Sequence, residues 1–353
     1  MTPHALPISI ETPAEFADDL GAPVAAHYGD PAGELSAMQK SVAMVDRSAR
    51  GAVTVTGPDT LRFLQDLLSQ DLADLGDGEG VHTLLLQPQG KLDVDLRLLR
   101  ITNEEFRLDC EVGMGERLAA SLERYRIRVK VQIEDRTETE GCIMLRGPET
   151  IGRVETVLGV EAPPTQHHHA VADSGLRVVR ANWPGLTETG GSTGVDLLGL
   201  RSVITTAWAA LRESGVRPAG LDAYETARII AGIPRQGRDL DERTIPQEAF
   251  LDGDAVSFTK GCFIGQELVC RIDTRGHVNR YLRLLRLDAA AAVGAEIVAD
   301  GKVVGQVTSV ARISTAPEGF AALGYVRREL QPPAPVTLNT PTGAIPATVE
   351  AIP

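Results

Sequence analysis

Cysteine is scarce in this chain, and its spacing fits neither a metal site nor a redox pair. The 353 residues include four cysteines, which are Cys110, Cys142, Cys262 and Cys270. No two of them form a Cys-x-x-Cys pair or a zinc-type spacing. Four cysteines could close two disulfides, but a chain of this length can bury a core that needs none. We therefore expect reduced thiols, as in a cytosol, and no metal site.

Long apolar runs are also missing. No window offers the roughly 18 consecutive apolar residues that a membrane-spanning helix needs. The first twenty residues lack the basic start and the apolar stretch of a secretory signal peptide. These absences predict a soluble cytoplasmic protein that makes no contact with a membrane.

An excess of positive charge is absent as well, since the formal net charge is −13. A general nucleic-acid binder needs a basic field that neutralises phosphates, so we expect no direct binding to nucleic acid. A hydrophobic share of 43% and a charged share of 24% are those of an ordinary globular protein. The length predicts two or three domains.

Two stretches that lie ninety residues apart share one pattern. GAVTVTGPDTLRFLQDLL, from Gly51, has a strand-like alternation, a Gly-Pro-Asp turn and a helical leucine stripe. CIMLRGPETIGRVETVL, from Cys142, has an apolar run, a Gly-Pro-Glu turn and a similar helical stripe. We interpret the pair as a degenerate duplication of a strand–turn–helix unit, although such turns are common enough for chance to explain it.

The rest of the chain predicts an α+β fold with a separate β-rich end. Residues 1–35 are rich in proline, alanine, glycine and acidic residues and suggest a loose N-terminal lead-in. Within the region 36–280, strands and helices alternate as in α+β modules with largely antiparallel sheets, about 36–140 and 141–280. Short strands broken by glycine and proline predict a small barrel or sandwich over 281–353.

The stretch TKGCFIGQELVCRID, residues 259–273, places Cys262 just ahead of a helical pattern, and Lys260 lies two residues earlier. A nearby ammonium and the positive end of a helix dipole both favour the thiolate form of a cysteine. The alternative is a small buried residue at a tight turn, and local reasoning leaves the two open. Cys270 falls inside the helix and is more typical of a core position.

A second candidate is Asp95, in a predicted strand whose polar positions also carry Lys91, Asp93 and Arg97. Two carboxylates at positions i and i+2 can share a proton or hold a cationic amine. The alternative is a solvated strand face with alternating charges, and the residues on their own favour that alternative.

A third candidate region is GLDAYETARIIAGIPRQGRDLDERTIPQE, residues 220–248. Glu225 and Arg228 are i,i+3 neighbours on a helix, for which an exposed ion pair is the simplest interpretation. Many charges then crowd a loop that is tied down by Pro234 and Pro246, which suggests a shaped site.

Arginines gather between residues 271 and 286, where Asp273 is the sole opposing charge. This basic patch could hold an anion such as a polyglutamate tail or an acidic partner, or it could blunt an exposed strand edge. The arginines are Arg271, Arg275, Arg280, Arg283 and Arg286. His167–His169 lie in a proline-containing loop, for which solvated side chains are favoured over a metal site.

These residues resemble a known family. KGCFIGQE, residues 260–267, resembles the signature of the YgfZ family of folate-binding proteins for iron–sulfur cluster assembly and repair, whose fold is related to the glycine-cleavage T-protein. VDRSARGAVTVTGPDTLRFLQDLLSQDL is similar to the family's N-terminal unit, and QGKLDVDLRLLR to the strand that carries an aspartate in T-proteins. The segment 220–248 and the stretch VVGQVTSVA resemble the central segment and the C-terminal barrel. The likeness covers residues 36–350.

The resemblance implies a three-domain ring around a central opening in which tetrahydrofolate, or a one-carbon derivative of it, binds. Cys262 matches the cysteine that the family needs for function. Lys260, Gln266 and Glu267 match the motif partners of that cysteine, and the last two are counted as cofactor-binding candidates.

Asp95 and Arg228 match positions that line the folate site of T-protein relatives, and Glu225 is grouped with them as a cofactor-binding candidate. T-proteins carry an acidic residue for the pterin in a GYTGEDG-like segment. The nearest stretch here is GLTETGGSTGVDLL, in which no residue aligns cleanly with that acid and Glu188 is the candidate substitute.

The resemblance predicts a tetrahydrofolate-binding accessory protein for iron–sulfur cluster assembly or repair that acts through Cys262. A single cysteine cannot hold a cluster, because four ligands are usual. Any cluster is therefore transient and shared, across a dimer or with a client protein. The expected partners are iron–sulfur assembly proteins or client enzymes. Conventional turnover is not expected, and support of tRNA modification is expected without direct binding to tRNA.

The alternative is an enzyme, a folate-dependent aminomethyltransferase or demethylase, in which Asp95 orients or deprotonates the folate nitrogen that accepts the one-carbon unit. A third hypothesis is a folate-free scaffold that offers the ring to partner proteins.

Overall fold

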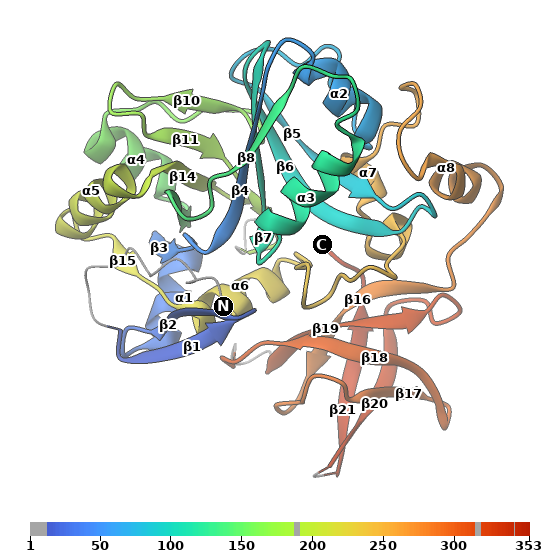
Figure 1. Ribbon diagram of the computed structural model, residues 1–353. Helices are drawn as coiled ribbons and strands as arrows, with labels where there is room; N and C mark the ends of the chain where they lie inside the picture. Colours follow the sequence, from blue (N-terminus) through green and yellow to red (C-terminus); the bar gives the residue numbers. More distant parts are fainter. Residues whose placement is uncertain (1–12, 187–190, 315–318, 342) are drawn as a thin grey trace.

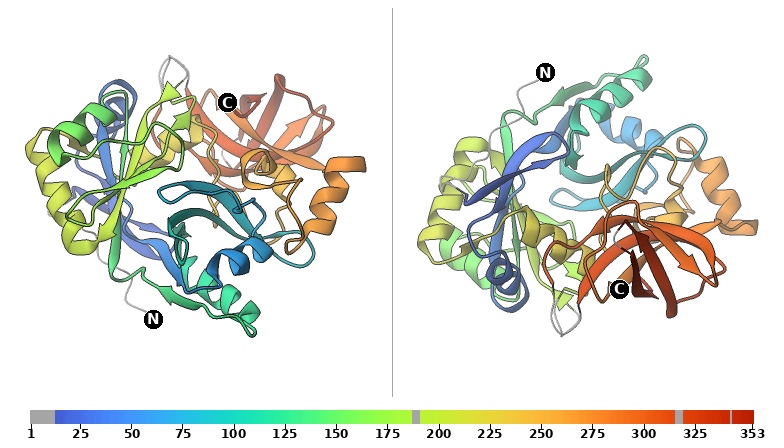
Figure 2. Two further views of the ribbon diagram at one scale, coloured as in Figure 1. Left: turned by 90° about the horizontal axis from the view of Figure 1, so that it is seen from above. Right: turned by 90° about the horizontal axis from the view of Figure 1, so that it is seen from below.

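The chain forms two α+β modules and a β-barrel, which surround a common centre (Figure 1). Two further views show the same three bodies side by side (Figure 2). No helix among the described residues is long and apolar enough to cross a membrane. The computed structural model describes residues 13–186, 191–314, 319–341 and 343–353.

The first module is a five-stranded antiparallel sheet, in the order β5-β6-β7-β4-β8, with two helices packed against it. Its strands and helices are β4 (Arg50–Thr56), β5 (Gly80–Leu86), β6 (Leu92–Thr102), β7 (Glu105–Val112), β8 (Gln132–Asp135), α2 (Thr60–Leu67) and α3 (Gly115–Tyr125). Val53 and Val55 of β4 meet the leucine stripe of α2 in one buried core, as periods of two residues in a strand and 3.6 in a helix require.

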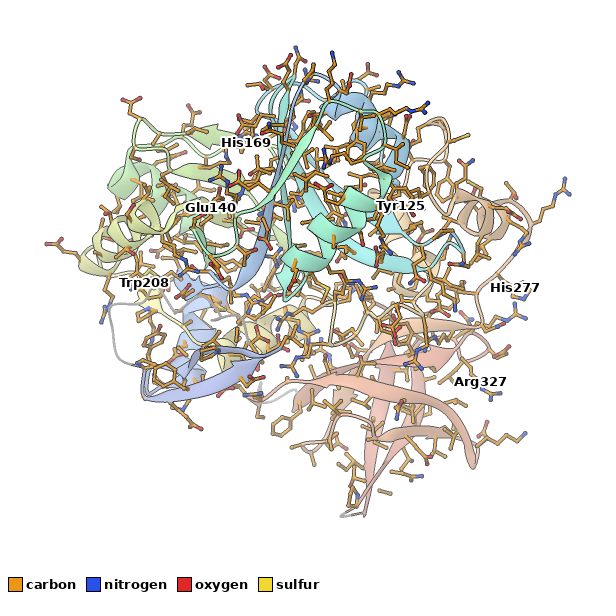
Figure 3. The ribbon with its side chains drawn as sticks, viewed as in Figure 1. Tyr125, Glu140, His169, Trp208, His277 and Arg327 are labelled. Atoms are coloured by element: carbon orange, nitrogen blue, oxygen red, sulfur yellow. The ribbon has the colours of Figure 1, made fainter. Side chains whose placement is uncertain are left out.

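The second module has the strand order β10-β11-β14-β9-β3-β15, in which β15 alone among these described strands pairs in parallel. Its elements are β3 (Ala43–Asp46), β9 (Glu140–Arg146), β10 (His169–Val171), β11 (Arg177–Arg180), β14 (Gly194–Leu200), β15 (Arg217–Pro218), α4 (Thr150–Leu158) and α5 (Arg201–Glu213). Trp208 of α5 is buried in the core between sheet and helices (Figure 3). A short hairpin of β12 (Trp183–Pro184) and β13 (Gly191–Ser192) extends the module.

The predicted duplication is visible in the two sheets. The order β5-β6-β7-β4-β8 corresponds, strand for strand, to β10-β11-β14-β9-β3. Both strand–turn–helix units turn at a glycine with positive φ, Gly57 at +128° and Gly147 at +131°. A Cβ on either glycine would meet a backbone carbonyl, of Lys130 or Ser41, at 2.3 Å. The same backbone requirement therefore acts at both positions.

Residues 13–35, expected to be a loose lead-in, are folded. They form the hairpin of β1 (Glu15–Asp19) and β2 (Ala22–His27) and the start of α1 (Pro31–Lys40). Helix α1 packs on α6 (Leu221–Ile230). The Asp19 side chain is fully buried in ion pairs with the body of the protein, so this hairpin is an integral part of the structure.

The predicted small β-domain is a closed six-stranded barrel in the order β16-β19-β18-β17-β20-β21. Leu285, Ile297, Leu338 and Val349 belong to its core, while Leu282 of β16 faces the modules. Its strands are β16 (Arg280–Leu287), β17 (Glu296–Ala299), β18 (Lys302–Val310), β19 (Phe320–Arg327), β20 (Ala334–Thr340) and β21 (Gly343–Glu350). A connecting segment with η1 (Pro246–Ala249), α7 (Asp252–Ala255) and α8 (Gln266–Arg275) leads into the barrel.

Candidate functional site

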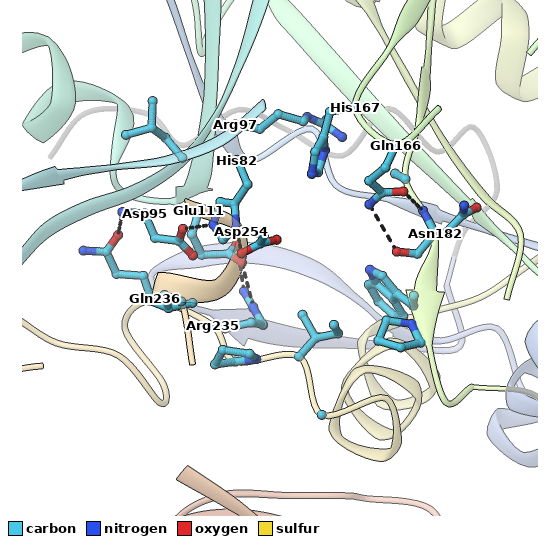
Figure 4. A pocket seen from close by; sticks show the side chains of 18 of the residues that line it. His82, Asp95, Arg97, Glu111, Gln166, His167, Asn182, Arg235, Gln236 and Asp254 are labelled. Atoms are coloured by element: carbon cyan, nitrogen blue, oxygen red, sulfur yellow. Dashed lines mark hydrogen bonds and ion pairs between the residues drawn. The ribbon is translucent and has the colours of Figure 1, made fainter. Parts of the chain in front are cut away.

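A cavity of about 490 Å³ lies where the two modules and the connecting segment meet. Besides β5, β6 and β14, its walls include residues from 166–184, 232–236 and 249–254, and Ile352 and Pro353 reach it after the last barrel strand. Figure 4 shows polar side chains from these separate segments around one opening. The cavity is therefore assembled from parts of the chain that are far apart in sequence.

Seven residues of the described chain were predicted to be catalytic or cofactor-binding, and Asp95 alone among them lines the cavity. The other six are Cys262, Lys260, Arg228, Glu225, Gln266 and Glu267. The Oδ1 atom of Asp95 lies 2.5 Å from Nε2 of His82 on the neighbouring strand β5. Nδ1 of His82 lies 3.1 Å from Oδ1 of Asp254 in α7. The imidazole is thus held between two carboxylates.

These contacts determine the charge of His82. Burial disfavours the imidazolium, but the charge of Asp95 and the hydrogen bond to Asp254 outweigh it and raise the pKa of His82 to about 10. Burial also acts to raise the pKa of Asp254, yet His82 outweighs this and keeps that pKa below its ordinary value. At neutral pH His82 is therefore a cation that donates from both ring nitrogens.

The backbone of Asp95 is held by Gln236 of the connecting segment. The Asp95 N–H donates to Gln236 Oε1 at 2.9 Å, and Gln236 Nε2 donates to the carbonyl of Asp93 at 2.8 Å. The pairing of β6 with β7 begins only at Leu96, so this edge of β6 is open at Asp95. One amide side chain therefore supplies the hydrogen bonds that a neighbouring strand would otherwise make.

Asp93 does not share a proton with Asp95, in contrast to the pairing that the sequence suggested. The β5–β6 ladder shifts register at Asp93, which is the extra residue of a bulge, and bulges redirect side chains. The Asp93 carboxylate instead accepts hydrogen bonds from Arg117 and Ser121 of α3, both at 2.7 Å. The alternative of a solvated face is also wrong, since Asp93 and Arg97 are 7% and 8% exposed.

A second cluster of charges joins the two modules across the cavity wall. Arg97 of β6 bonds Asp109 of β7 and, at 2.8 Å, Asp196 of β14. Arg146 donates to the other carboxylate oxygen of Asp196 at 2.9 Å. Burial acts to raise the pKa of Asp196, but the arginines outweigh it and keep that pKa below its ordinary value. The Nε atoms of Arg97 and Arg146 are buried and have no hydrogen-bond partner among the described residues.

Asp196 is the acidic residue that sequence reasoning missed in this wall. The residue selected there, Glu188, lies outside the described residues. Asp196 belongs to the same stretch and lines the cavity. The alternation of β14 could have found it, because Val195 and Leu197 fill the core and a polar residue between them must face the other side.

A third cluster lies behind the cavity and contains the predicted Glu225 and Arg228. Arg235, which lines the cavity, bonds Glu225 at 2.6 Å and Glu111 at 2.8 Å. Arg228 is fully buried and bonds Glu225 at 2.7 Å and Asp239 at 2.5 Å. The predicted exposed ion pair between Glu225 and Arg228 is therefore wrong. The pair is buried, and its Glu225 carboxylate holds Arg235. Its part in cofactor binding stays a prediction.

Two aromatic rings form flat parts of the cavity wall. Trp183 and Tyr224 lie with their ring centroids 5.6 Å apart. The guanidinium of Arg146 lies 4.5 Å from the centre of the Trp183 ring, and that of Arg47 lies 4.4 Å from the centre of the Tyr224 ring. Cations that stack on aromatic rings in this way hold the rings in fixed orientations.

The loop that carries Cys262 lies outside the cavity. Cys262 is exposed and precedes α8. The ammonium of Lys260 donates to three carbonyls at the end of α2, those of Gln65, Leu68 and Gln70, at 2.6, 2.7 and 3.0 Å. Burial lowers the pKa of Lys260 to about 8. Lys260 therefore ties this loop to the first module, and its predicted activation of Cys262 stays a prediction.

Gln266 and Glu267 begin helix α8 and also lie away from the cavity. Gln266 Oε1 accepts a hydrogen bond from the N–H of Phe263 at 3.3 Å, which closes the turn at Gly265, where φ is +79°. Glu267 is exposed. Their predicted part in cofactor binding is untested by these contacts and stays a prediction.

The histidine loop contributes one of its three histidines, His167, to the cavity, beside Gln166. Burial and the charge of Arg97 lower the pKa of His167 to about 3, so this lining residue is neutral. His169 bonds the carbonyl of Arg100 and the guanidinium of Arg177 instead. Over the described ranges, no three histidine, cysteine or acidic side chains form a group that could hold a metal ion.

The arginines between residues 271 and 286 do not form a single patch. Arg280 bonds Glu248 at 3.0 Å, and Arg286 bonds Glu350 at 3.0 Å. Arg271 is exposed on α8. The predicted basic surface is therefore divided among separate environments.

Proteins similar in sequence to this chain carry transferase names. A family model described as the GCVT N-terminal domain matches residues 8–260. The aminomethyltransferase of Chlorobium phaeovibrioides is 29% identical over 338 residues, which cover 92% of this chain and 90% of that protein. The aminomethyltransferase of Prosthecochloris aestuarii is 30% identical over 254 residues, or 70% and 69%. A putative chloroplastic transferase of Arabidopsis thaliana is 27% identical over 84% of this chain and 67% of its own length.

A solved structure shares the fold. The glycine cleavage system aminomethyltransferase T from Bartonella henselae matches with a TM-score of 0.86 over 96% of this chain and 94% of that chain, at 22% identity. The predicted T-protein-like arrangement of α+β modules and a C-terminal barrel is therefore confirmed. The finer likeness to the YgfZ family stays a prediction.

Proposed function

We propose, since this chain belongs to the GCVT N-terminal domain family, that its central cavity binds a tetrahydrofolate and that Asp95 contacts the nitrogen that carries the one-carbon unit. One observation carries the proposal: the Asp95 carboxylate projects into a cavity of about 490 Å³ and is held there by His82. Cavities of this size suit small organic ligands and cofactors.

The chemistry of the wall suits a flat ring with polar edges. Trp183 and Tyr224 offer apolar surfaces, and the charged residues Arg97 and Arg146 also line the cavity. Flat apolar surfaces beside a few polar groups are typical of sites that bind small organic ligands.

Bound tetrahydrofolate would supply a secondary amine nitrogen that accepts or releases a one-carbon group. On the protein side, Asp95 Oδ1 is taken by His82, while Asp95 Oδ2 has no partner among the described residues. Oδ2 is therefore the atom that would accept the ligand N–H. The imidazolium of His82 holds Asp95 in place, and Asp254 orients the imidazolium.

We propose the accessory role in iron–sulfur cluster assembly or repair as the finer function, with Cys262 as the partner-facing thiol. Two observations support it: the thiol is exposed, and Lys260 anchors its loop through three carbonyls. Thiolates are the usual ligands of iron–sulfur clusters. A thiol outside the cavity can meet a partner protein while the cavity holds its ligand.

The test is calorimetric titration of tetrahydrofolate into the wild type and the Asp95→Ala and Cys262→Ala variants. Binding should survive the loss of Cys262 and weaken about tenfold or more without Asp95, as for a lost hydrogen bond to a charged group. Absence of binding to the wild type would remove folate from the function. Iron–sulfur enzymes that remain active in cells carrying Cys262→Ala alone would remove the accessory role.

The second candidate is aminomethyl transfer, which the names of the relatives favour. Here Asp95 would orient or deprotonate the accepting nitrogen during turnover. A direct assay of folate-dependent transfer from an aminomethyl donor separates the two: activity lost in Asp95→Asn and kept in Cys262→Ala favours the enzyme.

A further inference from the structure

Arg283 on β16 is a buried arginine without a carboxylate partner. Arg283 is 8% exposed. Its side chain makes no hydrogen bond or ion pair with any described residue. Arg280, three residues earlier on the same strand, bonds Glu248 through two nitrogens. An unpaired buried charge is unfavourable. An anion beside Arg283 would therefore stabilise it, and the described chain does not supply one.

Two aromatic rings frame this guanidinium. Phe250 and Tyr281 are stacked with ring centroids 5.3 Å apart and an interplanar angle of 13°. Cζ of Arg283 lies 5.3 Å from the Phe250 centroid and 4.9 Å from the Tyr281 centroid. The guanidinium is therefore fixed against a flat apolar surface.

Phe250 connects this group to the cavity. It lines the cavity and is 41% exposed, so it lies at the rim, where both the cavity and the solvent reach it. Its backbone has a φ of +59°, a conformation that is uncommon for a bulky residue. The turn after η1 thus places a large ring at the rim although the local backbone disfavours it.

The pKa values of Arg280 and Arg283 shift in opposite directions, in agreement with their different partners. For Arg280, burial is outweighed by the hydrogen bond and charge of Glu248, and its pKa is raised. For Arg283, burial dominates and the pKa is lowered. An incoming anion would therefore improve the environment of Arg283 more than that of Arg280.

We propose that Arg283, Phe250 and Tyr281 form a subsite at the rim of the cavity for a carboxylate joined to an aromatic ring. The proposal rests on the proposed folate function, because folates carry an aminobenzoyl ring that ends in glutamate. The ring packs on the exposed surface of Phe250. The glutamate carboxylate takes paired hydrogen bonds from the Arg283 guanidinium. The subsite favours glutamylated folates over forms that lack glutamate.

The test compares two ligands in three proteins by calorimetry. The ligands are tetrahydrofolate and the primary amide of tetrahydropteroate, which has the same rings but carries no carboxylate. The proteins are the wild type, Arg283→Gln and the control Arg327→Gln, which removes an exposed charge from the same barrel (Figure 3). Arg283→Gln should weaken the binding of tetrahydrofolate about tenfold or more and leave the binding of the tetrahydropteroate amide unchanged, while Arg327→Gln should change neither.

The outcomes separate the subsite from the wider function. Equal weakening of both ligands in Arg283→Gln, or of neither, overturns the subsite and leaves folate binding in place. If the wild type binds neither ligand, the folate function fails, and p-aminobenzoylglutamate alone then decides: binding that Arg283→Gln abolishes supports the subsite, and absence of binding overturns it. Arg283→Lys, which keeps the charge but not the paired geometry, replaces Arg283→Gln if that variant does not fold.

Discussion

Replacement of Asp95 by asparagine should lower the pKa of His82. The ring nitrogens of His82 lie 2.5 Å from Asp95 and 3.1 Å from Asp254. These contacts raise its pKa to about 10 against burial. The Asp95→Asn substitution keeps the shape of the side chain and removes one of the two charges, so that the imidazolium loses its nearer counter-ion.

The structure indicates which carboxylate matters more. The rise of the His82 pKa from 6.5 to about 10 corresponds to about 5 kcal/mol in favour of the imidazolium. This is a net value, because the cost of burying the charge is already subtracted from the interaction with the carboxylates. Asp95 is 21% exposed and Asp254 is 67% exposed, so solvent screens Asp254 more strongly. Loss of a close counter-charge lowers a pKa by about one to three units. Asp95→Asn should fall in that range, and Asp254→Asn should produce the smaller change.

The assay is an NMR titration of the His82 ring in protein labelled at histidine. The matched pair Asp95→Asn and Asp254→Asn is titrated beside the wild type. A wild-type His82 that titrates near the ordinary histidine value, or a His82 that is unmoved by Asp95→Asn, would refute the contact. A larger change in Asp254→Asn would refute the ranking of the two carboxylates.

The same contact makes stability depend on pH. The His82 pKa is raised on folding, so its stabilisation is fully present below about pH 6.5, the ordinary histidine value. It is lost as the pH rises toward about 10. Urea unfolding at pH 6 and pH 9 should therefore give a smaller pH dependence in Asp95→Asn than in the wild type. An unchanged dependence would contradict the assignment.

Three other substitutions test separate parts of the structure. Lys260→Met should destabilise the fold by about 2–4 kcal/mol in urea unfolding, because three carbonyls at the end of α2 lose a charged donor; an effect no larger than that of Lys302→Met on the barrel surface would count against this anchor. Asp19→Asn should lower the free energy of unfolding by about 3–5 kcal/mol, because two buried arginines lose a carboxylate partner. The variant should also make the N-terminal hairpin sensitive to limited proteolysis. A hairpin that stays as resistant as in the wild type would argue against the ion pairs. Cys262→Ala should change stability by no more than about 0.5 kcal/mol, because the thiol is exposed; a marked loss in thermal unfolding would contradict that placement.

Sequence reasoning predicted the fold where its signals are local. The alternation of Val53 and Val55, the leucine stripe of α2 and the two glycine turns lie within about twenty residues, and periodicity captures them. The C-terminal barrel was predictable because its strands are short and divided by glycine and proline. In each case neighbouring residues encode the element that they form.

The site was harder to predict because its contacts span the chain. His82 meets Asp254 across 172 positions, and Gln236 meets Asp95 across 141. No local pattern marks His82, Gln236 or Asp254 as neighbours of the aspartate. Helix α6 is buried on almost all sides. A pattern of one exposed and one buried face therefore does not apply to it and could not show that Glu225 is buried.

The long reach of these contacts bears on the order in which the protein matures during synthesis. Both Asp95 and Asp254 must leave the ribosome before His82 can contact the two carboxylates, and Asp254 follows Asp95 by 159 positions. A nascent chain that ends before the connecting segment can hold a complete first sheet and lack the cavity altogether. The His82 contacts of the binding site thus form only after the connecting segment has been translated, and a ligand that needs them can stabilise only a chain that includes this segment.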